Sequence, residues 1–289
     1  VLSPSLLGFT SFYSFQNHYG QVVKRHFGAR SFRQVVGYQN LEELSERVDR
    51  FSYRVLKKEC LDLPDKVYLR REVELTPEQK KVYGELKEYA IAELGEMEQV
   101  SVNNVLTQML RLHQVVCGYT KTDEGTEIPI ENNRIDELIN VIGEMRGKII
   151  IWANYRHNIK EIVETMQELG GPDCVASYYG DTSDEERESV IERFQDPDSE
   201  LRYFVGNTQT GGYGITLTQA QNVIYYSNNF DLEKRLQSED RAHRIGQDSK
   251  VTYVDLVAPK TVDENIVKAL RNKLNLAQEV LGDEKWKSW

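Results

Sequence analysis

The chain has 289 residues, of which 39% are hydrophobic and 28% are charged, and its formal net charge is −10 at pH 7. This length and apolar content suffice for one large or two modest domains with buried cores, and they exclude a disordered or collagen-like chain. No apolar run approaches the ~18 residues of a membrane span and no signal-peptide pattern opens the chain, so we expect an intracellular protein without a membrane partner.

The acidic excess disfavours a protein coated with nucleic acid, although a local basic track remains compatible with it. Cys60, Cys117 and Cys174 are widely separated and have no metal-ligand spacing, so we expect reduced, structural thiols and no metal site. The chain does not begin with Met, and we expect it to be a fragment of a longer protein.

The predicted elements begin with an aromatic-rich and basic stretch over residues 1–53. Aromatic rings interleaved with bases could form a nucleic-acid surface, but more often such rings pack against a neighbouring layer. A helix is expected to begin at Asn40. Residues 66–75 alternate between apolar and polar side chains, which predicts an extended strand.

Two helices are predicted next. The run Thr76–Gln79 combines an N-cap, a first-turn proline and a capping box, so a helix is expected from there to about residue 94. A second helix is expected over residues 102–116, with His113 at the edge of the core rather than as a ligand, because no other His or Cys lies at ligand spacing. Residues 121–128 are polar and predict an exposed loop and a domain boundary.

From Asn133 onwards, apolar runs alternate with amphipathic segments. Such runs are typical of strands buried in a parallel sheet, and the amphipathic segments are typical of covering helices. The pattern predicts an α/β fold with a doubly wound parallel sheet, preceded by a mainly helical segment. The predicted strands are 148–152, 175–179, 203–205, 223–226 and 251–257, and the predicted helices span 134–145, 155–169, a segment beginning after Ser183, and a segment from Thr261 to about residue 281.

A loop with three glycines follows the strand predicted at 203–205. Gly211, Gly212 and Gly214 have no Cβ atoms, so backbone amides near them can approach a ligand closely. This feature alone is a weak signal, because glycine-rich loops occur for many reasons.

A polar helix is predicted over Leu232–Ile245, closed by Gly246. On that helix Gln237, Arg241 and Arg244 would share one face. A guanidinium gives phosphate oxygens paired hydrogen bonds and keeps its charge at any working pH, so two arginines on one face suit a polyphosphate ligand. The alternative is an exposed helix with solvated charges, which is the commoner explanation of a lone arginine pair.

Several strings of residues resemble motifs of the Snf2 family of helicase-like, DNA-dependent ATPases. Gln237–Gln247 resembles motif VI, Thr210–Thr218 resembles motif V, Ile149–Tyr155 resembles motif IV, and Leu63–Lys66 resembles a Leu-Pro-x-Lys block. The family commonly has Ala at the position of Thr210, Asn at that of Thr216 and a Trp-Asn-Pro run near residues 230–232. These departures indicate a divergent branch of the kind found in phages and bacteria.

The resemblance implies a RecA-like C-terminal helicase lobe over residues 131–270. It also implies the end of the first lobe and a linker over 1–75, a helical extension over 76–130 and a C-terminal helix over 271–289. The site residues that it implies are Arg241, Arg244 and Gln237 as catalytic residues, Gly212, Gly214 and Gln247 as nucleotide-binding residues, and Asn154, Tyr155, Arg156, Thr208, Gln209 and Thr210 as DNA-binding residues.

An ATPase of this class also needs a GxxxxGK[ST] loop and an acidic pair for Mg²⁺, and the chain contains neither in the required form. By resemblance, ATP and Mg²⁺ would be bound mainly by a first lobe outside this chain, so the chain alone should not hydrolyse ATP. The implied partners are double-stranded DNA and that N-terminal lobe. The implied location is the cytoplasm, with the nucleoid or in a phage-infected bacterium, or the nucleus in a eukaryote.

Two other functions share part of this pattern. A catalytically inert adaptor that binds DNA or protein would not need Gln237, Arg241 and Arg244 at this spacing. An RNA helicase of a related branch is disfavoured by the ending Arg244-Ile245-Gly246-Gln247, which resembles the Snf2 form. The leading hypothesis is therefore the second lobe of an ATP-dependent motor that moves on duplex DNA.

Overall fold

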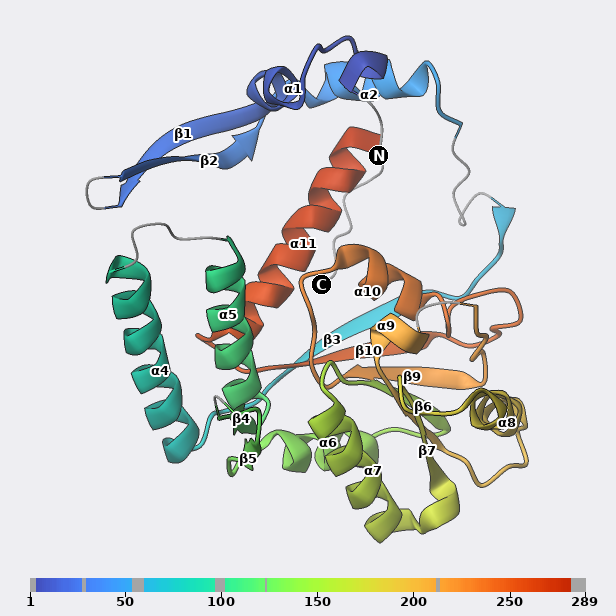
Figure 1. Cartoon of the computed structure of the whole chain (residues 1–289). Coiled ribbons are helices and arrows are strands. Elements are labelled where there is room, and N and C mark those ends of the chain that lie inside the picture. Colours follow the sequence, from blue (N-terminus) through green and yellow to red (C-terminus); the bar gives the residue numbers. More distant parts are fainter. Residues whose placement is uncertain are drawn as a thin grey trace. The chain divides into compact units, whose positions relative to one another are not determined.

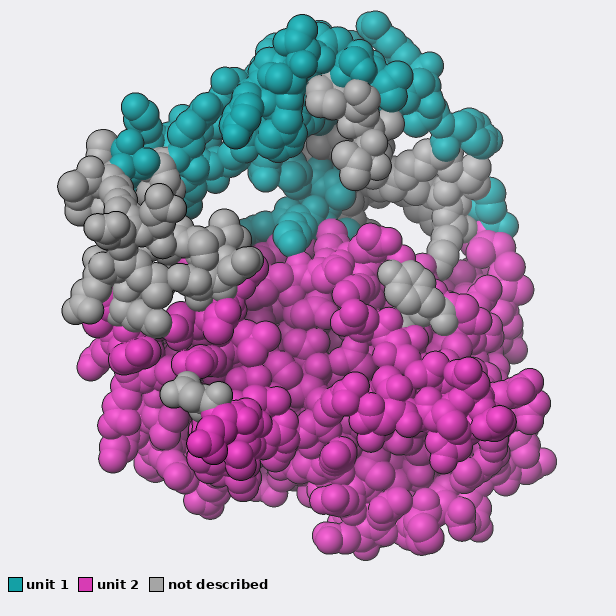
Figure 2. Space-filling model, viewed as in Figure 1, with its two compact units in different colours: residues 1–60, 272–287 teal, residues 61–271, 288–289 magenta. Residues whose placement is uncertain are grey.

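The computed structural model describes residues 4–27, 30–53, 60–96, 102–122, 124–211 and 214–281. The chain divides into two compact units, shown in different colours in Figure 2. Unit 1 consists of residues 1–60 and 272–287, and unit 2 consists of residues 61–271 and 288–289. None of the helices in the described residues is long and apolar enough to cross a membrane.

Unit 1 contains an antiparallel hairpin that the sequence analysis did not predict. Its strands pair from Gly20 with Tyr38 to Phe27 with Arg30. The hairpin was missed because its strands carry bases, for example Lys24 opposite Arg33, in place of a regular alternation of apolar and polar side chains. The elements are η1 (Pro4–Leu7), α1 (Phe12–Tyr19), β1 (Gly20–Phe27), β2 (Arg30–Tyr38) and the predicted helix α2 (Leu41–Asp49).

Three aromatic rings of unit 1 pack against one another. The ring centroids of Phe9 and Phe15 are 5.7 Å apart, and those of Phe15 and Tyr19 are 5.1 Å apart. Tyr19 is only 3% exposed, whereas Phe12 and Tyr13 are 60% and 67% exposed. The packing explanation therefore holds for these three rings, whereas Phe12 and Tyr13 mostly face solvent.

Unit 2 is built on one parallel sheet of six strands in the order β3-β10-β9-β6-β8-β7 (Figure 1). The five strands predicted after Asn133 are confirmed. The sixth, β3, is the strand predicted before the helical segment, and it pairs in parallel with β10. The elements of this unit are β3 (Lys66–Glu72), α4 (Pro77–Glu96), α5 (Val102–Val116), β4 (Tyr119–Lys121), β5 (Glu127–Pro129), α6 (Arg134–Gly143), β6 (Lys148–Trp152), α7 (Arg156–Gly170), η2 (Pro172–Cys174), β7 (Val175–Tyr178), α8 (Asp184–Gln195), β8 (Tyr203–Gly206), α9 (Thr208–Gly211), β9 (Ala220–Tyr225), α10 (Leu232–Glu239), β10 (Val251–Val257) and the first half of α11 (Val262–Leu281). The residues of α11 from Asn272 onwards belong to unit 1.

The central strand β6 is buried on both of its faces. Ile149 and Ile151 pack with α6 and α7, which lie together on one side of the sheet in Figure 1. Ile150 and Trp152 point the other way and pack with Phe194 of α8. Successive side chains of a strand alternate between faces, so a continuous apolar run is what a sheet covered on both sides requires.

The helical segment before the sheet packs through α4, α5 and α11. Leu75, Val116, Ile266 and Leu270 form its core. The predicted capping box of α4 is confirmed: the backbone N–H of Gln79 donates to Thr76 Oγ1, and the backbone N–H of Thr76 donates to Gln79 Oε1, both at 3.1 Å. The exposed loop predicted over 121–128 is confirmed between the strands of a short hairpin: of its described residues, only Lys121, in β4, and Glu127 and Ile128, in β5, are paired.

Candidate functional site

Three strands of the sheet end at the same level. Trp152 of β6 pairs with Gly206 of β8 and with Tyr225 of β9. The segments that follow these strands therefore meet at one edge of the sheet, which is where open α/β sheets bind their ligands. Both stretches of DNA-binding residues implied by the resemblance, 154–156 and 208–210, lie there, after Trp152 and after Gly206.

Asn207 ties these segments together, and the sequence analysis did not single it out. Its Nδ2 donates to the carbonyl oxygen of Asn154 (2.8 Å), and its Oδ1 accepts from the backbone N–H of Gln209 (2.7 Å). The backbone N–H of Asn154 in turn donates to Ser227 Oγ (2.9 Å). An Asn directly after a buried strand was the available signal, because such a residue often caps the next turn.

The six expected DNA-binding residues differ in how far they are available to a ligand. Gln209 and Arg156 are exposed, Asn154 and Thr210 are half-buried, and Thr208 is buried. Arg156 pairs with Asp181 at 3.0 Å, but this pair is exposed to solvent and so contributes little. The predicted loop at 208–210 is the one-turn helix α9.

Tyr155 is engaged inside the protein. Its hydroxyl lies 2.8 Å from His113 Nδ1, and its ring contacts that of Tyr119 edge-on at 5.6 Å. Burial raises the pKa of the Tyr155 hydroxyl far above its ordinary value, so this group remains a neutral hydroxyl. These contacts favour a role in which Tyr155 anchors the backbone between Asn154 and Arg156 to the protein interior.

The helix predicted over Leu232–Ile245 is wrong in its second half. Helix α10 ends at Glu239, and residues 240–246 form a series of turns that we name the arginine turn. The three residues Gln237, Arg241 and Arg244 therefore do not share one helical face. Gly246 does not close α10 but lies within the last of these turns at φ +96°, a conformation that suits glycine.

Arg241 is held in place by two backbone carbonyls. Its Nε donates to the carbonyl oxygen of Gln237 (3.0 Å), and its Nη1 donates to that of Ile215 (3.1 Å). Burial, together with the neighbouring charge of Arg244, lowers the pKa of Arg241. Two adjacent guanidinium groups repel each other, so an anion placed beside them would stabilise both charges.

Arg244 is exposed, and its Nη1 donates to Thr216 Oγ1 at 2.9 Å. Thr216 stands in the glycine loop, where the Snf2 family commonly has Asn. Gln237 uses its side-chain amide to donate to Glu233 Oε1 at 2.9 Å. The structure thus joins both arginines to the segment Ile215–Thr216, one through a carbonyl and one through a hydroxyl.

The glycine loop, which contains Gly211, Gly212 and Gly214, has free space around Gly214. Gly214 has φ +74°, and a Cβ atom on it would meet no atom within 4 Å. A Cβ on Gly211 would lie 2.6 Å from the Trp152 ring, so Gly211 is required for packing instead. Gly212, an expected nucleotide-binding residue, lies outside the described residues.

Gln247 is 5% exposed, and its amide is engaged on both sides. Its Nε2 lies within hydrogen-bond distance of the carbonyl oxygens of Thr218 (3.0 Å), Ala220 (3.0 Å) and Ala242 (3.1 Å), and its Oε1 accepts from the backbone N–H of Ser249. This geometry favours Gln247 as the residue that fastens the arginine turn to the start of β9, rather than as a direct contact of a nucleotide.

A buried charge cluster lies beneath the arginine turn, and the sequence analysis missed it. Arg235 is 2% exposed and forms two hydrogen bonds to Asp255, at 2.5 and 3.1 Å. Its Nε donates to Glu239 Oε1 at 2.9 Å, and its Cζ lies 3.5 Å from the centre of the Tyr225 ring. No local pattern predicts this cluster, because an Arg in a polar helix usually faces solvent.

A second buried cluster runs behind the sheet edge. Asp263, fully buried, pairs with Arg134 at 2.5 Å and lies 3.5 Å from His113. Arg134 also donates to the carbonyl oxygen of Tyr226 at 2.5 Å. Burial alone would lower the pKa of His113, but Cys117 and the Asp263 carboxylate raise it to about 9. His113 therefore lies inside the core, facing the Asp263 carboxylate, rather than at the edge of the core as predicted.

This cluster predicts a pH dependence of stability. Because the folded-state pKa of His113 lies above the ordinary value of 6.5, protonated His113 stabilises the fold below pH 6.5, and this contribution is lost as the pH rises through about 9. We expect the free energy of unfolding to fall by up to about 3 kcal/mol across this range. Urea unfolding at pH 6.5 and at about pH 9 measures this change in the free energy of unfolding. In His113→Gln, whose side chain does not titrate, the free energy of unfolding should depend less on pH. Equal slopes for the two proteins would contradict the assignment.

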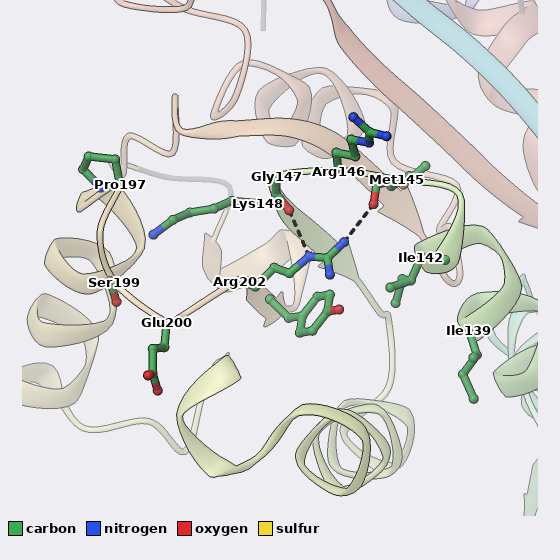
Figure 3. Close-up of a pocket in the computed structure, with 12 residues that line it drawn as sticks. Ile139, Ile142, Met145, Arg146, Gly147, Lys148, Pro197, Ser199, Glu200 and Arg202 are labelled. Atoms are coloured by element: carbon green, nitrogen blue, oxygen red, sulfur yellow. Dashed lines mark hydrogen bonds between the residues drawn. The ribbon is translucent and has the colours of Figure 1, made fainter.

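A pocket of about 730 Å³ lies at the opposite, amino-terminal end of β6 and β8 (Figure 3). Arg202 on its wall donates to the carbonyl oxygens of Gly147 (3.1 Å) and Met145 (2.8 Å). Lys148 donates to two further backbone carbonyls, of Arg193 and Asp196. These cations are thus already engaged, and the pocket is a weaker candidate than the opposite edge. Within the described residues, no group of three or more His, Cys, Asp or Glu side chains is arranged to hold a metal ion.

Comparison with known proteins agrees with this geometry. The family model described as the helicase conserved C-terminal domain matches residues 132–246. An uncharacterized ATP-dependent helicase of Mycoplasma pneumoniae is 28% identical over 248 residues, which cover 85% of this chain and 24% of that protein. The SWI/SNF chromatin-remodeling complex subunit snf22 of Schizosaccharomyces pombe is 27% identical over 248 residues, 80% of this chain and 15% of its own length.

The solved structure of a Sulfolobus solfataricus SWI2/SNF2 ATPase core in complex with double-stranded DNA is also similar. It superposes with a TM-score of 0.58 and 25% identity over 98% of this chain and 58% of its own. The chain spans at most about a quarter of the two curated relatives described above. The sheet order, the motif positions and these similarities agree, and we conclude that the chain contains a helicase conserved C-terminal domain with the RecA-like fold of Snf2 ATPase C-terminal lobes, and that it is similar to helicases of the Snf2 family.

Proposed function

We propose that this chain acts as the second motor lobe of an ATP-dependent translocase on double-stranded DNA. The observation that carries the proposal is the arginine turn, in which an exposed Arg244 stands beside a braced Arg241. An arginine supplied from a second lobe stabilises the charge that develops on a transferred γ-phosphate. ATP and Mg²⁺ would be bound mainly by a nucleotide-binding lobe outside this chain.

The two arginines divide the task in this proposal. Arg241 donates two of its N–H groups to backbone carbonyls, so its guanidinium is held in position before a ligand binds. Arg244 is exposed and is steadied at one Nη atom by Thr216. Arg244 is therefore the residue that we assign to the γ-phosphate, and Arg241 holds the turn and adds positive potential. Preorganised charge of this kind costs no rearrangement when the reaction occurs.

The DNA backbone would be bound at the carboxyl ends of β6 and β8. Gln209 and Arg156 are exposed there, and Asn207 joins their two segments through the carbonyl of Asn154. A bound phosphate that shifted one segment would thus act on the other. Contacts of amide and guanidinium groups with phosphate carry no sequence information, which suits a motor that moves along any duplex.

The salt dependence of DNA binding tests this surface on the chain itself. We expect weak binding to duplex DNA, with an affinity that falls steeply with salt, and Arg156→Ala should reduce the slope of log K against log salt by about 1 because one phosphate contact is lost. The matched control is Arg146→Ala, since Arg146 is also exposed but lies at the opposite end of β6. If both variants changed the slope equally, or neither did, the proposed surface would be wrong.

A further inference from the structure

The Leu-Pro-Asp-Lys block at residues 63–66 lies against the arginine turn, although no role follows for it from the proposed function. The Lys66 ammonium lies 2.9 Å from Glu239 Oε2 and 3.8 Å from Asp240 Oδ1. The carbonyl oxygen of Pro64 lies 2.7 Å from His243 Nε2. One short segment thus contacts the turn at its beginning and again near its middle.

The contact with Glu239 is buried and fully ionic. The Glu239 side chain is 0% exposed and that of Lys66 is 12% exposed. Burial by itself would raise the pKa of Glu239, but Lys66 and Arg235 hold it below the ordinary value, so the carboxylate stays charged. The Tyr68 hydroxyl also donates to Glu239 Oε2 at 2.7 Å. Two residues of strand β3 therefore fix the side chain on which α10 ends.

The contact with His243 has a defined direction. A carbonyl oxygen only accepts hydrogen bonds, so Nε2 of His243 must carry the hydrogen that it shares with Pro64. The Nε2–H form of the ring is thereby selected. Because His243 is only half-buried, its replacement should perturb this contact without emptying the core.

Both contacts affect the positions of the arginines through backbone hydrogen bonds of the turn. The carbonyl oxygen of Glu239 accepts from the backbone N–H groups of Ala242 (3.2 Å) and His243 (3.1 Å). These two residues lie between Arg241 and Arg244, and Ala242 is 0% exposed. A displacement of Pro64 or Lys66 would therefore move Glu239 and His243, and with them both guanidinium groups.

We infer that Lys66 and His243 are positioning residues for Arg241 and Arg244. The polypeptide enters unit 2 at Leu61, so the segment that sets the arginine turn is also the first part of this unit after unit 1. The position of the arginines is thereby coupled to the strand by which the chain enters the lobe. This inference rests on the proposed function, because it assumes that the arginines act on a nucleotide.

The first experiment measures backbone hydrogen exchange in the 289-residue chain. Lys66→Met and His243→Asn should each accelerate exchange of the Ala242 and His243 amides by about 10-fold, since each removes a hydrogen bond that closes the turn. His243→Gln should keep the slow exchange of the unaltered chain. The Gln Nε2 reaches the position of the imidazole Nε2, whereas the shorter Asn amide does not. Unchanged exchange in Lys66→Met and His243→Asn would overturn the inference.

The matched control is Lys250→Met. Lys250 pairs with Asp65 of the same segment at 3.5 Å, but both side chains are exposed, at 67% and 81%. Its removal should leave the exchange of the arginine turn as it is in the unaltered chain. Acceleration as large as in Lys66→Met would mean that any charge change near this segment loosens the turn, and it would also overturn the inference.

The second experiment uses the longer protein that also carries the nucleotide-binding lobe. Lys66→Met and His243→Asn should lower kcat for ATP by about 10- to 100-fold, the effect of a small misplacement of a catalytic group, with KM for ATP little changed. His243→Gln should recover most of kcat. Normal kcat in Lys66→Met and His243→Asn, in a protein whose turnover Arg244→Ala abolishes, would overturn the inference alone. Normal turnover in Arg244→Ala would instead overturn the proposed function and the catalytic part of the inference with it.

Discussion

Replacement of Arg244 by alanine, in a protein that also carries the nucleotide-binding lobe, is expected to lower ATP turnover by about 10³-fold or more. Arg244 is exposed and its guanidinium donates to one threonine hydroxyl, so its removal should hardly change the melting temperature or the affinity for DNA. Turnover and melting temperature are to be measured on the same preparations. The 289-residue chain alone should show no turnover with ATP, Mg²⁺ and duplex DNA.

The two arginines give a comparison within one turn. Arg241→Ala should also lower turnover, but it should lower stability as well, because Arg241 bridges the carbonyls of Gln237 and Ile215. Arg244→Lys should restore little activity, since an ammonium lacks the planar fork of donors. Lost stability with normal turnover per folded molecule, in both alanine variants, would mean that the arginines are structural and would favour an inert adaptor.

The largest effect on stability is expected from Arg235→Met. This change leaves Asp255 buried, 5% exposed, without the guanidinium that pairs with it, and it removes one partner of the fully buried Glu239. Breaking a buried charge pair by removing one partner costs about 3–5 kcal/mol. Urea unfolding monitored by circular dichroism measures the change in the free energy of unfolding.

The control for this prediction is Arg70→Met. Arg70 pairs with Glu72 at 3.0 Å and with Glu264 at 3.4 Å, but its side chain is 38% exposed. Its loss should therefore cost less than about 1 kcal/mol. A cost of Arg235→Met no larger than that of Arg70→Met would show that water reaches the cluster, and the account of a buried ionic base under the arginine turn would fail.

The sheet was predictable because a local pattern of residues marks each of its strands. The run Lys148–Trp152 is apolar, short and bounded by turns, and the structure places it at the centre of the sheet. Strand 251–257 was predicted to the residue. The capping boxes at Thr76 and Ser183 likewise depend on side chains three residues apart, so both helix starts could be read from the sequence.

The arginine turn was not predictable by the same means. Nothing between Leu232 and Ile245 breaks a helix, and local propensity favours a continuous one. The helix ends at Glu239 in a structure where that side chain is fastened to Lys66, which lies 173 residues earlier in the chain. Ala242 is then buried with the residues of the sheet. Contacts with distant segments decide where this helix ends, and a single sequence does not show them.

The same limit applies to the side-chain contacts of two predicted site residues, Gln247 and Tyr155. Gln247 stands at a motif position, but three backbone carbonyls from two segments are within reach of its amide, and they were not visible in the sequence. Tyr155 follows a strand end as a ligand residue should, yet its hydroxyl faces His113 on α5. In both cases tertiary packing, which a single sequence does not show, decides the direction of the side chain.

Strand β3 limits where this lobe can be cut out of the chain without breaking its sheet. The family match covers residues 132–246, whereas the sheet draws one edge strand from 66–72 and its neighbour from 251–257. A protein trimmed to the matched span would lack both and would leave β9 with a row of unpaired backbone groups next to Val223 and Tyr225, which are buried in the intact sheet. Such an edge invites intermolecular strand pairing and aggregation. The smallest cooperative folding unit that includes the complete sheet therefore begins before Lys66 and ends after Val257, and domain swaps within the family should be cut there.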